Sequence, residues 1–458
     1  MRKMMKFGGS SLANAERIHA VYEILRSEVQ AGHEVAVVVS AIQGITNDLL
    51  SLCEQAADRT GLLNRIILRH TDLVTELGLS EDRELHGRIK ALNAGIRELM
   101  VDGPETQLHQ MEWQDEVLSL GERYSATIIS HYLSSLGLPG RFIDSRDLVL
   151  TDNSFGHAYV HYQQSYDRVR QAIPDLGAIP VITGFLGATE SGQTTTLGRS
   201  GSDYSAAIFG AALNVDEVHI WTDVNGILTT HPDWVPSAHT IPELSYEEAM
   251  ELAHAGAKVV FPPTMIPLQY KGIPIVIKNS YAPEEDGTRI VREREVGDDV
   301  IVGISSLRHV SLIRLSGPGM VGVRGINARL FNCLAEAGIS IMLVSQAFSE
   351  HSTCFALQPQ ETDLAIEAVE AEFARELRFK YIDTVRAERD MSLVAVVGEG
   401  MLTTPGMAGR VFDLLGEQAI NVEAIAQGAT RRNISFVVRD EDLVRAVNIL
   451  HAGLFGRN

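Results

Sequence analysis

The sequence predicts an α/β protein, in which a domain with a mainly parallel central sheet is followed by two small ferredoxin-like α+β units. Two observations carry this prediction. Over the first two-thirds of the 458-residue chain, short β-branched runs alternate with longer segments of helical period, which is typical of strands joined by crossover helices. In the last third, a pattern of strand, glycine turn, helix and strand occurs twice.

The first domain is expected to span residues 1–295. Residues 50–120 have the spacing of consecutive amphipathic helices, which predicts a helical subregion beside the sheet. The run Tyr281–Gly287 has no periodicity and the pattern changes after Glu295, so we place the domain boundary there. The predicted strands include Val35–Ser40, Ile179–Thr183, Val218–Thr222 and Ile273–Lys278.

The two C-terminal units are related by an internal repeat. Gly317 aligns with Gly398, an offset of 398 − 317 = 81 residues. The same offset aligns Gly325 with Gly406, and Gln346 with Gln427. The expected units are residues 296–390 and 391–458, and a strand from about residues 300–308 is a candidate to complete the second unit.

Composition excludes several classes of protein. The chain is 45% apolar and 21% charged, as in globular proteins, and its formal charge of −20 argues against a nucleic-acid or anionic-membrane surface. Cys53, Cys333 and Cys354 match no metal spacing and suit a reducing compartment. No apolar run is long enough to cross a bilayer, so we expect a cytoplasmic protein whose mature chain starts at or near Met1.

A candidate phosphate-binding loop lies close to the N-terminus, in the run Lys6-Phe7-Gly8-Gly9-Ser10-Ser11. Gly8 and Gly9 let backbone N–H groups approach an anion closely, the following helix adds its positive end, and Lys6 supplies a point charge. Taken alone, a Gly-Gly pair is also consistent with an ordinary tight turn.

Four further segments contain residues suited to binding anions or cations. They are Gly121-Glu122, Gly198–Asp203, Trp221–Gly226 and Gly256–Lys258. The second opens a helix with a glycine-rich N-terminus and supplies an arginine, Arg199, that can pair with a carboxylate. Each also has an ordinary structural explanation: a solvated glutamate, a surface arginine, a polar turn, and a lysine at a helix C-terminus.

Together these segments resemble the aspartokinase family over essentially the whole chain, and most closely the kinase part of bifunctional aspartokinase/homoserine dehydrogenases. The resemblance implies an amino acid kinase domain followed by tandem ACT domains. The chain stops about where the fused enzymes continue, so no dehydrogenase activity is expected. The matching motifs are Lys6–Ser11, Ser40-Ala41, Thr46-Asn47, Gly121-Glu122, Thr195–Tyr204, Trp221–Val224, Gly256–Lys258, Ser316–Met320 and Ile425–Gly428.

This resemblance implies that ATP phosphorylates the side-chain carboxylate of L-aspartate to give 4-phospho-L-aspartate, the first step toward lysine, threonine and methionine. Magnesium is expected to bridge the ATP phosphates through water and substrate oxygens, and no protein ligand is assigned to it. By similarity, the catalytic residues are Lys6, Asp203 and Lys258. The aspartate-binding residues are Ser40, Thr46, Glu122, Arg199 and Ser202. The ATP-binding residues are Lys6, Gly8, Gly9, Ser10, Thr222, Asp223 and Lys258.

The chain departs from the family pattern on the nucleotide side. His231 and Asp233 stand where relatives have an aspartate and an arginine, and Pro263 replaces another family arginine. Because a negative charge beside a polyphosphate weakens binding, we expect a working kinase with weak or unusual nucleotide binding.

The resemblance also implies regulation by an amino acid. Met342 stands where relatives inhibited by lysine carry an acidic residue, whereas the glutamines of threonine-sensitive relatives are present in both repeats. We therefore favour threonine as the effector and expect a homodimer or higher homo-oligomer through the ACT domains. A simpler explanation is that the glutamines satisfy backbone groups at strand ends. The candidate effector residues are Val344, Gln346, Ile425 and Gln427.

Two alternatives stay open. One is a non-catalytic or weakly active amino-acid sensor, which the departures at His231, Asp233 and Pro263 suggest. The other is an amino acid kinase for glutamate or a nucleoside monophosphate. The second is disfavoured because such kinases lack the Arg-x-Gly-Ser-Asp block and tandem ACT units.

Overall fold

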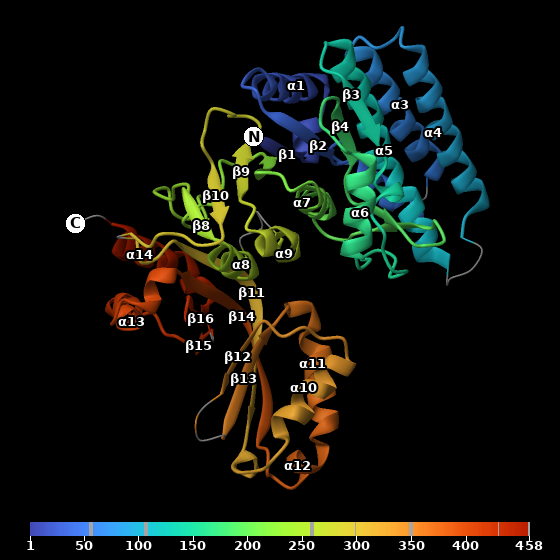
Figure 1. Cartoon of the computed structure of the whole chain (residues 1–458). Helices are drawn as coiled ribbons and strands as arrows, with labels where there is room; N and C mark the ends of the chain where they lie inside the picture. The colour runs from blue at the N-terminus through green and yellow to red at the C-terminus, as the bar shows by residue number, and fades with distance from the viewer. Residues whose placement is uncertain are drawn as a thin grey trace. The chain divides into compact units, whose positions relative to one another are not determined.

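The computed structural model describes residues 1–54, 58–104, 109–256, 261–297, 299–346, 348, 351–428 and 430–456. These residues divide into two compact units, and each is described by itself (Figure 1). The first comprises the described residues of Met1–Ile227, Thr240–Tyr246 and Val259–Arg294. The second comprises those of Leu228–His239, Glu247–Lys258 and Glu295–Asn458.

The first unit is built on one mixed sheet. Neighbouring strands are parallel from β3 to β9, β10 runs antiparallel to β9, and β8 is parallel to β10. This arrangement confirms the predicted, mainly parallel sheet. In spatial order, its described strands are β3 (Gly140–Ile143), β4 (Ile179–Thr183), β2 (Glu34–Val39), β1 (Arg2–Phe7), β7 (Glu217–Thr222), β9 (Ile275–Asn279), β10 (Thr288–Val291) and β8 (Glu243–Ser245).

Helices cover both faces of this sheet. On β1, Met4 and Met5 point to opposite faces and both are fully buried, as expected of a central strand in a parallel sheet. Met5 and Phe7 share a core with the helices between residues 15 and 135, whereas α7 packs against β1, β2 and β7. The helices of this unit are α1 (Ala15–Gln30), α2 (Ile45–Cys53), α3 (Arg59–Glu76), α4 (Arg83–Asp102), α5 (Gln110–Ser135), α6 (Tyr162–Ala172), α7 (Gly201–Leu213) and α9 (Pro262–Lys271).

The predicted helical subregion is present as α2 to α5, and α3, α4 and α5 lie side by side (Figure 1). A short 3₁₀ helix, η1 (Gly9–Leu12), links β1 to α1, and a second, η3 (Ser145–Asp147), follows β3. A small antiparallel pair, β5 (Leu186–Ala188) and β6 (Thr194–Thr196), precedes α7.

The second unit contains an antiparallel sheet. Its two longest strands, β11 and β14, pair along most of their length in the middle of the sheet. In spatial order, the described strands are β12 (Leu343–Gln346), β13 (Ser352–Leu357), β11 (Gly303–Ser316), β14 (Thr384–Val397), β16 (Asn433–Arg439) and β15 (Ala424–Gln427). The helices are α8 (Tyr246–His254, apart from its first residue), α10 (Ile326–Glu336), α11 (Thr362–Glu372), α12 (Ala374–Arg378), α13 (Met407–Glu417) and α14 (Leu443–Phe455).

The 81-residue repeat is visible in these elements. Helix α13 starts 407 − 326 = 81 residues after α10, and β15 starts 424 − 343 = 81 residues after β12. Gly325 and Gly406 cap the paired helices with φ values of 89° and 86°, which lie in the left-handed region that favours glycine. Each repeat therefore keeps the same backbone turn before its helix.

Strand β11 contributes to two cores. Ile313, in its second half, packs with α10 and α11, while Ile304, in its first half, packs with α13 and α14. The core around α13 and α14 also takes in Trp234 and Val235 from the segment Leu228–His239. Asn448 of α14 donates a hydrogen bond to the Trp234 carbonyl at 2.9 Å, which ties this segment to the C-terminal helix.

Within the described ranges, no helix combines the length and the apolar character needed to cross a membrane.

Candidate functional site

The carboxyl end of β1 carries the lysine of the candidate phosphate loop. Lys6 pairs in register with Val38 of β2 and Ile220 of β7, so its side chain rises from the middle of the sheet. Its Nζ lies 2.6 Å from Oδ1 of Asp203 in the first turn of α7, and the two side chains are only 11% and 14% exposed. The structure thus brings together two of the predicted catalytic residues as a nearly buried ion pair.

The loop after Lys6 needs glycine because of limited space. A Cβ on Gly9 would lie 3.1 Å from the Ala41 carbonyl oxygen and 3.3 Å from Gln43 Cα. A Cβ on Gly8 would lie 3.4 Å from Lys6 Nζ. Gly8 has an extended backbone with φ of −73°, so freedom of φ is not the reason for this glycine. Space is therefore limited at Gly9, whereas a Cβ on Gly8 would make an ordinary van der Waals contact; Ser10 follows and is half-buried.

Glu122 is the most deeply buried acidic group of the site, with 3% exposure. Its Oε1 accepts a hydrogen bond from the Ala41 N–H at 3.1 Å, and its Oε2 has no hydrogen-bond partner among the described residues. Burial raises the pKa of Glu122 to about 8, against the opposing effects of the Ala41 N–H and the Lys6 charge. One oxygen of this carboxyl group is therefore buried without a hydrogen-bond partner among the described residues.

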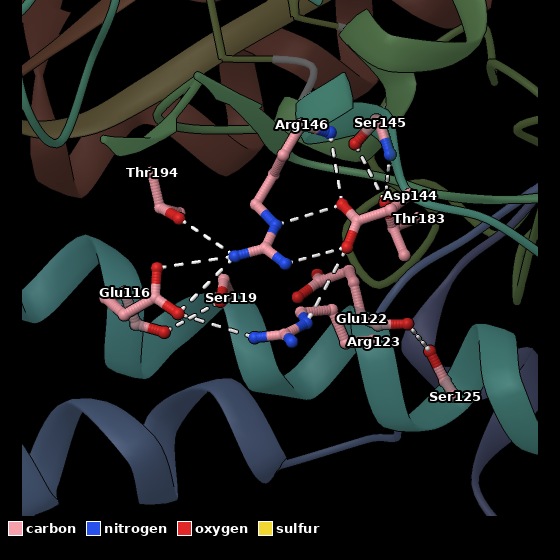
Figure 2. Close-up of polar contacts among 10 residues, drawn as sticks. All are labelled: Glu116, Ser119, Glu122, Arg123, Ser125, Asp144, Ser145, Arg146, Thr183 and Thr194. Carbon is pink, nitrogen blue, oxygen red and sulfur yellow. Dashed lines mark hydrogen bonds and ion pairs between the residues drawn. The ribbon is translucent and has the colours of Figure 1, made fainter. Parts of the chain in front are cut away.

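Gly121 explains how Glu122 reaches this position. A Cβ on Gly121 would lie 2.7 Å from the Ala41 Cβ, so only glycine lets α5 approach the end of β2 this closely. Ser125, one turn later, donates a hydrogen bond to the Ser40 carbonyl at 2.7 Å. The same hydroxyl contacts the Glu122 carbonyl at 3.1 Å (Figure 2). Helix α5 is thus fixed to the residues that follow β2.

A network of four charges fixes the same helix to the segment after β3 (Figure 2). Arg146 donates to both oxygens of Asp144, at 3.0 and 2.8 Å, and also contacts Glu116 of α5 at 3.4 Å. Arg123, the residue after Glu122, lies 3.4 Å from Glu116 and 3.7 Å from Asp144. Burial lowers the pKa of Arg123. The network therefore ties α5 to the segment that follows β3.

The block before α7 has the backbone of an anion site. Gly198 and Ser200 both have positive φ, 74° and 54°, and α7 begins at Gly201 without a side-chain cap. A Cβ on Gly201 would lie 2.5 Å from the Phe185 side chain, so this glycine is needed for close packing. Ser202 and Asp203 follow directly, and Ser202 is 8% exposed.

Arg199 is exposed, and within the described part of the chain it makes no hydrogen bond or ion pair. Ser40 is held by a hydrogen bond from its N–H to the Phe7 carbonyl at 3.1 Å. Thr46 is exposed in the first turn of α2, after Gly44, whose φ is 86°. Arg199 and Thr46 are therefore free to contact a ligand, but no contact between them and Glu122 is present.

The other predicted ATP residues follow β7. Thr222 ends the strand, and its hydroxyl donates to the exposed Asp223 at 3.2 Å. Because β1, β7 and β9 are parallel neighbours, their carboxyl ends bring this turn to the same edge of the sheet as the glycine loop. Lys258 lies outside the described residues.

The predicted effector residues lie in the second unit, at matching positions of the two repeats. Val344 and Gln346 belong to β12, and Ile425 and Gln427 belong to β15. Gln346 borders a cavity of about 330 Å³ at the N-terminus of α10, and its Oε1 accepts a hydrogen bond from Asn327 at 2.8 Å.

Sequence reasoning missed Asn327, and the repeat itself explains why. The position matching Asn327 in the second repeat is Ala408, so alignment at the 81-residue offset hides the asparagine. Sequence reasoning also missed Ser280 and Tyr281, which follow β9 and contact the glycine loop. Both residues directly follow a third parallel strand, and this position at the carboxyl edge of the sheet could have identified them from the sequence.

Among the described residues, no group of three or more histidine, cysteine, aspartate or glutamate side chains is placed to hold a metal ion.

Comparisons with known proteins give a consistent result. Residues 1–279 match the amino acid kinase family, and residues 313–373 and 394–454 match the ACT domain. The bifunctional aspartokinase/homoserine dehydrogenase of Haemophilus influenzae is 33% identical, over 99% of this chain and 56% of that protein. Aspartokinase 1, chloroplastic, of Arabidopsis thaliana is 31% identical, over 99% of this chain and 80% of that protein. The chain spans about half the length of the bifunctional relatives that it matches.

Two solved structures are similar over nearly the whole chain. Escherichia coli aspartokinase III in complex with aspartate and ADP has a TM-score of 0.81 at 29% identity, covering 99% of this chain and 100% of that chain. The aspartate kinase of Clostridium acetobutylicum has a TM-score of 0.84 at 25% identity, with the same coverage of both chains.

Proposed function

The chain belongs to the aspartokinases of the amino acid kinase family, and from this premise we propose that it transfers the γ-phosphoryl group of ATP to the side-chain carboxylate of L-aspartate. The observation that carries the proposal is the nearly buried Lys6–Asp203 pair beside a glycine loop, with the unsatisfied carboxyl group of Glu122 close to Lys6. In the reaction, a carboxylate oxygen of aspartate attacks the γ-phosphorus, and the bond to the bridging oxygen breaks with its electron pair leaving on ADP. The product is 4-phospho-L-aspartate.

No protein nucleophile is needed, because the substrate carboxylate is already ionised at neutral pH. Catalysis then consists of positioning and of neutralising charge on the transferred group. We propose that Lys6 and Lys258 contact the phosphates, while Gly8, Gly9 and Ser10 supply N–H and hydroxyl donors. Asp203 holds the Lys6 ammonium in place, which the 2.6 Å contact supports.

For the aspartate substrate, we propose that Glu122 binds the ammonium group and Arg199 pairs with a carboxylate. The free Oε2 of Glu122 and the absence of an ion pair at Arg199 within the described residues support these roles. Ser40, Thr46 and Ser202 complete the aspartate-binding residues. Thr222 and Asp223, at the end of β7, are proposed to border the adenosine.

Magnesium is proposed to enter with ATP. The described residues offer no set of three acidic or histidine ligands, so the phosphate oxygens and water are expected to supply most of its coordination. Bound there, the ion would neutralise phosphate charge.

Nucleotide affinity is proposed to be weak or unusual because of the changes at His231, Asp233 and Pro263. Asp233 lies in the second unit with its side chain 84% exposed, and His231 stacks on Trp234. Trp234 and Val235 of this segment pack with the C-terminal core of the second unit.

For regulation, we propose that threonine binds at the repeats, near Val344 and Gln346 in the first and Ile425 and Gln427 in the second. The cavity beside Gln346 supports a site of amino-acid size. A structure of E. coli aspartokinase III contains lysine, but Met342 gives a lysine ammonium no partner here. Pairing of ACT domains from two copies is proposed to form a homodimer or a higher homo-oligomer.

The proposal is tested by measuring aspartate-dependent ADP release at saturating Mg-ATP, with and without millimolar threonine. Turnover that requires aspartate and falls with threonine supports both parts. Turnover unaffected by threonine removes only the effector assignment. No turnover at high ATP, together with threonine binding, favours the non-catalytic sensor, while turnover with glutamate instead of aspartate favours another amino acid kinase.

A further inference from the structure

Ser280 connects two segments of the proposed nucleotide site. It is 2% exposed, directly after β9. Its hydroxyl lies 2.8 Å from that of Ser11 in the glycine loop, and it also reaches the Thr222 carbonyl at 3.1 Å. The Ser280 N–H donates to the same Thr222 carbonyl at 2.8 Å. One buried serine therefore joins the loop after β1 to the turn after β7.

Arg17 and Tyr281 extend this connection. Arg17, from the first turn of α1, donates to the Ser280 carbonyl at 2.6 Å, and its guanidinium carbon lies 3.5 Å from the centre of the Tyr281 ring. The Tyr281 hydroxyl donates to the Ser10 carbonyl at 3.2 Å. The described residues include no carboxylate paired with Arg17, so its charge is directed at this loop and ring.

From these contacts we infer that Ser280, Tyr281 and Arg17 are positioning residues for nucleotide binding, which hold the glycine loop at a fixed distance from the turn at Thr222. The inference rests on the proposed kinase function. Ser10, in the glycine loop after β1, and Thr222, at the end of β7, are proposed ATP contacts, and the backbone carbonyls of both are held by residues after β9. A loop that binds phosphate through backbone N–H groups depends on such fixing, because a small displacement misaligns several donors at once.

Because Tyr281 is partly exposed, a role in positioning the glycine loop can be tested separately from a role in stabilising the fold. Its side chain is 51% exposed, so removal of the hydroxyl deletes one contact to the loop and creates no cavity in the core. The predicted consequence is a change in ATP binding without a comparable change in stability or in aspartate binding.

The first test compares Tyr281→Phe with Tyr159→Phe. Tyr159 is 70% exposed in the same unit and provides a matched loss of a hydroxyl. We expect KM for ATP and Kd for ADP, the latter by calorimetry, to rise about fivefold in Tyr281→Phe, the equivalent of one hydrogen bond. Both constants should stay at the wild-type value in Tyr159→Phe, and KM for aspartate should be unchanged in both variants.

The second test compares Arg17→Lys with the control Arg26→Lys. Arg26 lies on the same helix, α1, and pairs with Glu23. Lysine keeps the charge but loses the planar stack on Tyr281, so we expect only Arg17→Lys to weaken ADP binding, by about fivefold or more. If both Tyr281→Phe and Arg17→Lys keep the wild-type Kd for ADP, the positioning role is wrong. If the wild type binds ADP but shows no turnover with aspartate, the proposed reaction fails while this test still stands.

Discussion

The Lys6 ammonium and the Asp203 carboxylate form an ion pair at 2.6 Å, although one lies on β1 and the other on α7. Both side chains are nearly buried, so each charge depends on the other for compensation. The pair is directed to the carboxyl edge of the sheet, where the glycine loop begins. In the proposed reaction, this pairing would leave the remaining N–H groups of Lys6 to donate to a phosphate.

Replacing Lys6 with methionine should greatly reduce turnover and also destabilise the fold. We expect kcat to fall roughly a hundredfold or more, because a charge aimed at the transferred group is lost. The unpaired Asp203 should cost about 2–4 kcal/mol in the free energy of unfolding, measured in urea. Lys3→Met is the control, because Lys3 also lies on β1 and forms a similarly buried pair, with Glu28 of α1, away from the glycine loop. Equal losses of kcat in the two variants would contradict a specific role for Lys6.

Aspartate binding should depend on pH through Glu122. Burial raises the pKa of its carboxyl group to about 8, so at lower pH the free protein holds a proton there, and a bound ammonium must displace it. We expect KM for aspartate at saturating ATP to rise as pH falls below 8, by up to about tenfold per pH unit. Glu122→Gln should bind aspartate weakly at every pH. A wild-type KM that does not change with pH would refute this assignment.

The raised pKa of Glu122 also makes protein stability depend on pH. Lower pH favours the folded state, whereas higher pH favours aspartate binding. Folding raises the pKa of Glu122 from 4.5 to about 8, so the folded state binds this proton more tightly than the unfolded state. Its contribution to stability is present below pH 4.5 and is lost as pH rises through 8. Chemical unfolding of Glu122→Gln should therefore depend less on pH over this range than unfolding of the wild type. An identical pH dependence in both proteins would show that the carboxyl group is ionised in the folded state.

Much of the fold could be predicted because it depends on patterns repeated along the chain. Four β-branched runs predicted four core strands, and they became β2, β4, β7 and β9. The 81-residue offset matches α10 to α13 and β12 to β15, because a shared glycine turn and apolar spacing repeat with them. The kinase motifs could be located as well, since glycine-rich turns between strands and helices are readable from local sequence.

Features that depend on a single contact across the fold could not be predicted. Trp234 and Val235 are apolar, but nothing local indicates that they join the core around α14. Ser280 is an ordinary serine in sequence, and its importance comes from the distance between its hydroxyl and that of Ser11. Similarly, Gly121 precedes Glu122 in a motif, but the reason for glycine is the nearby Ala41 Cβ.

Because the Ala41 Cβ leaves no room for a side chain at position 121, Gly121→Ala tests how α5 positions Glu122. The new Cβ would lie 2.7 Å from the Ala41 Cβ, so α5 must shift away from the end of β2 and weaken the hydrogen bond from Ala41 to Glu122. We expect a loss of about 1–3 kcal/mol in the free energy of unfolding and a higher KM for aspartate. Gly87→Ala is the control, because Gly87 lies within α4 with open space around it and should gain up to about 1 kcal/mol. A Gly121→Ala variant with wild-type stability and KM would show that this close approach is not needed.

The difference between the two repeats predicts which one responds to the effector. Among the described residues, the first repeat pairs its glutamine with an asparagine, Asn327 to Gln346, whereas Ala408 stands at the position of the second repeat that matches Asn327. If the cavity beside Gln346 binds threonine, Asn327→Ala should raise the threonine concentration needed for half-inhibition by roughly tenfold, because Gln346 loses the hydrogen bond that fixes its orientation. Asn421→Ala is the control, since Asn421 is in the second repeat and its side chain donates a hydrogen bond to Glu423 at 2.8 Å. Comparing Gln346→Ala with Gln427→Ala then separates the repeats: a larger effect at Gln346 supports the first repeat as the main effector site, whereas an effect at Gln427 alone would assign inhibition to the second.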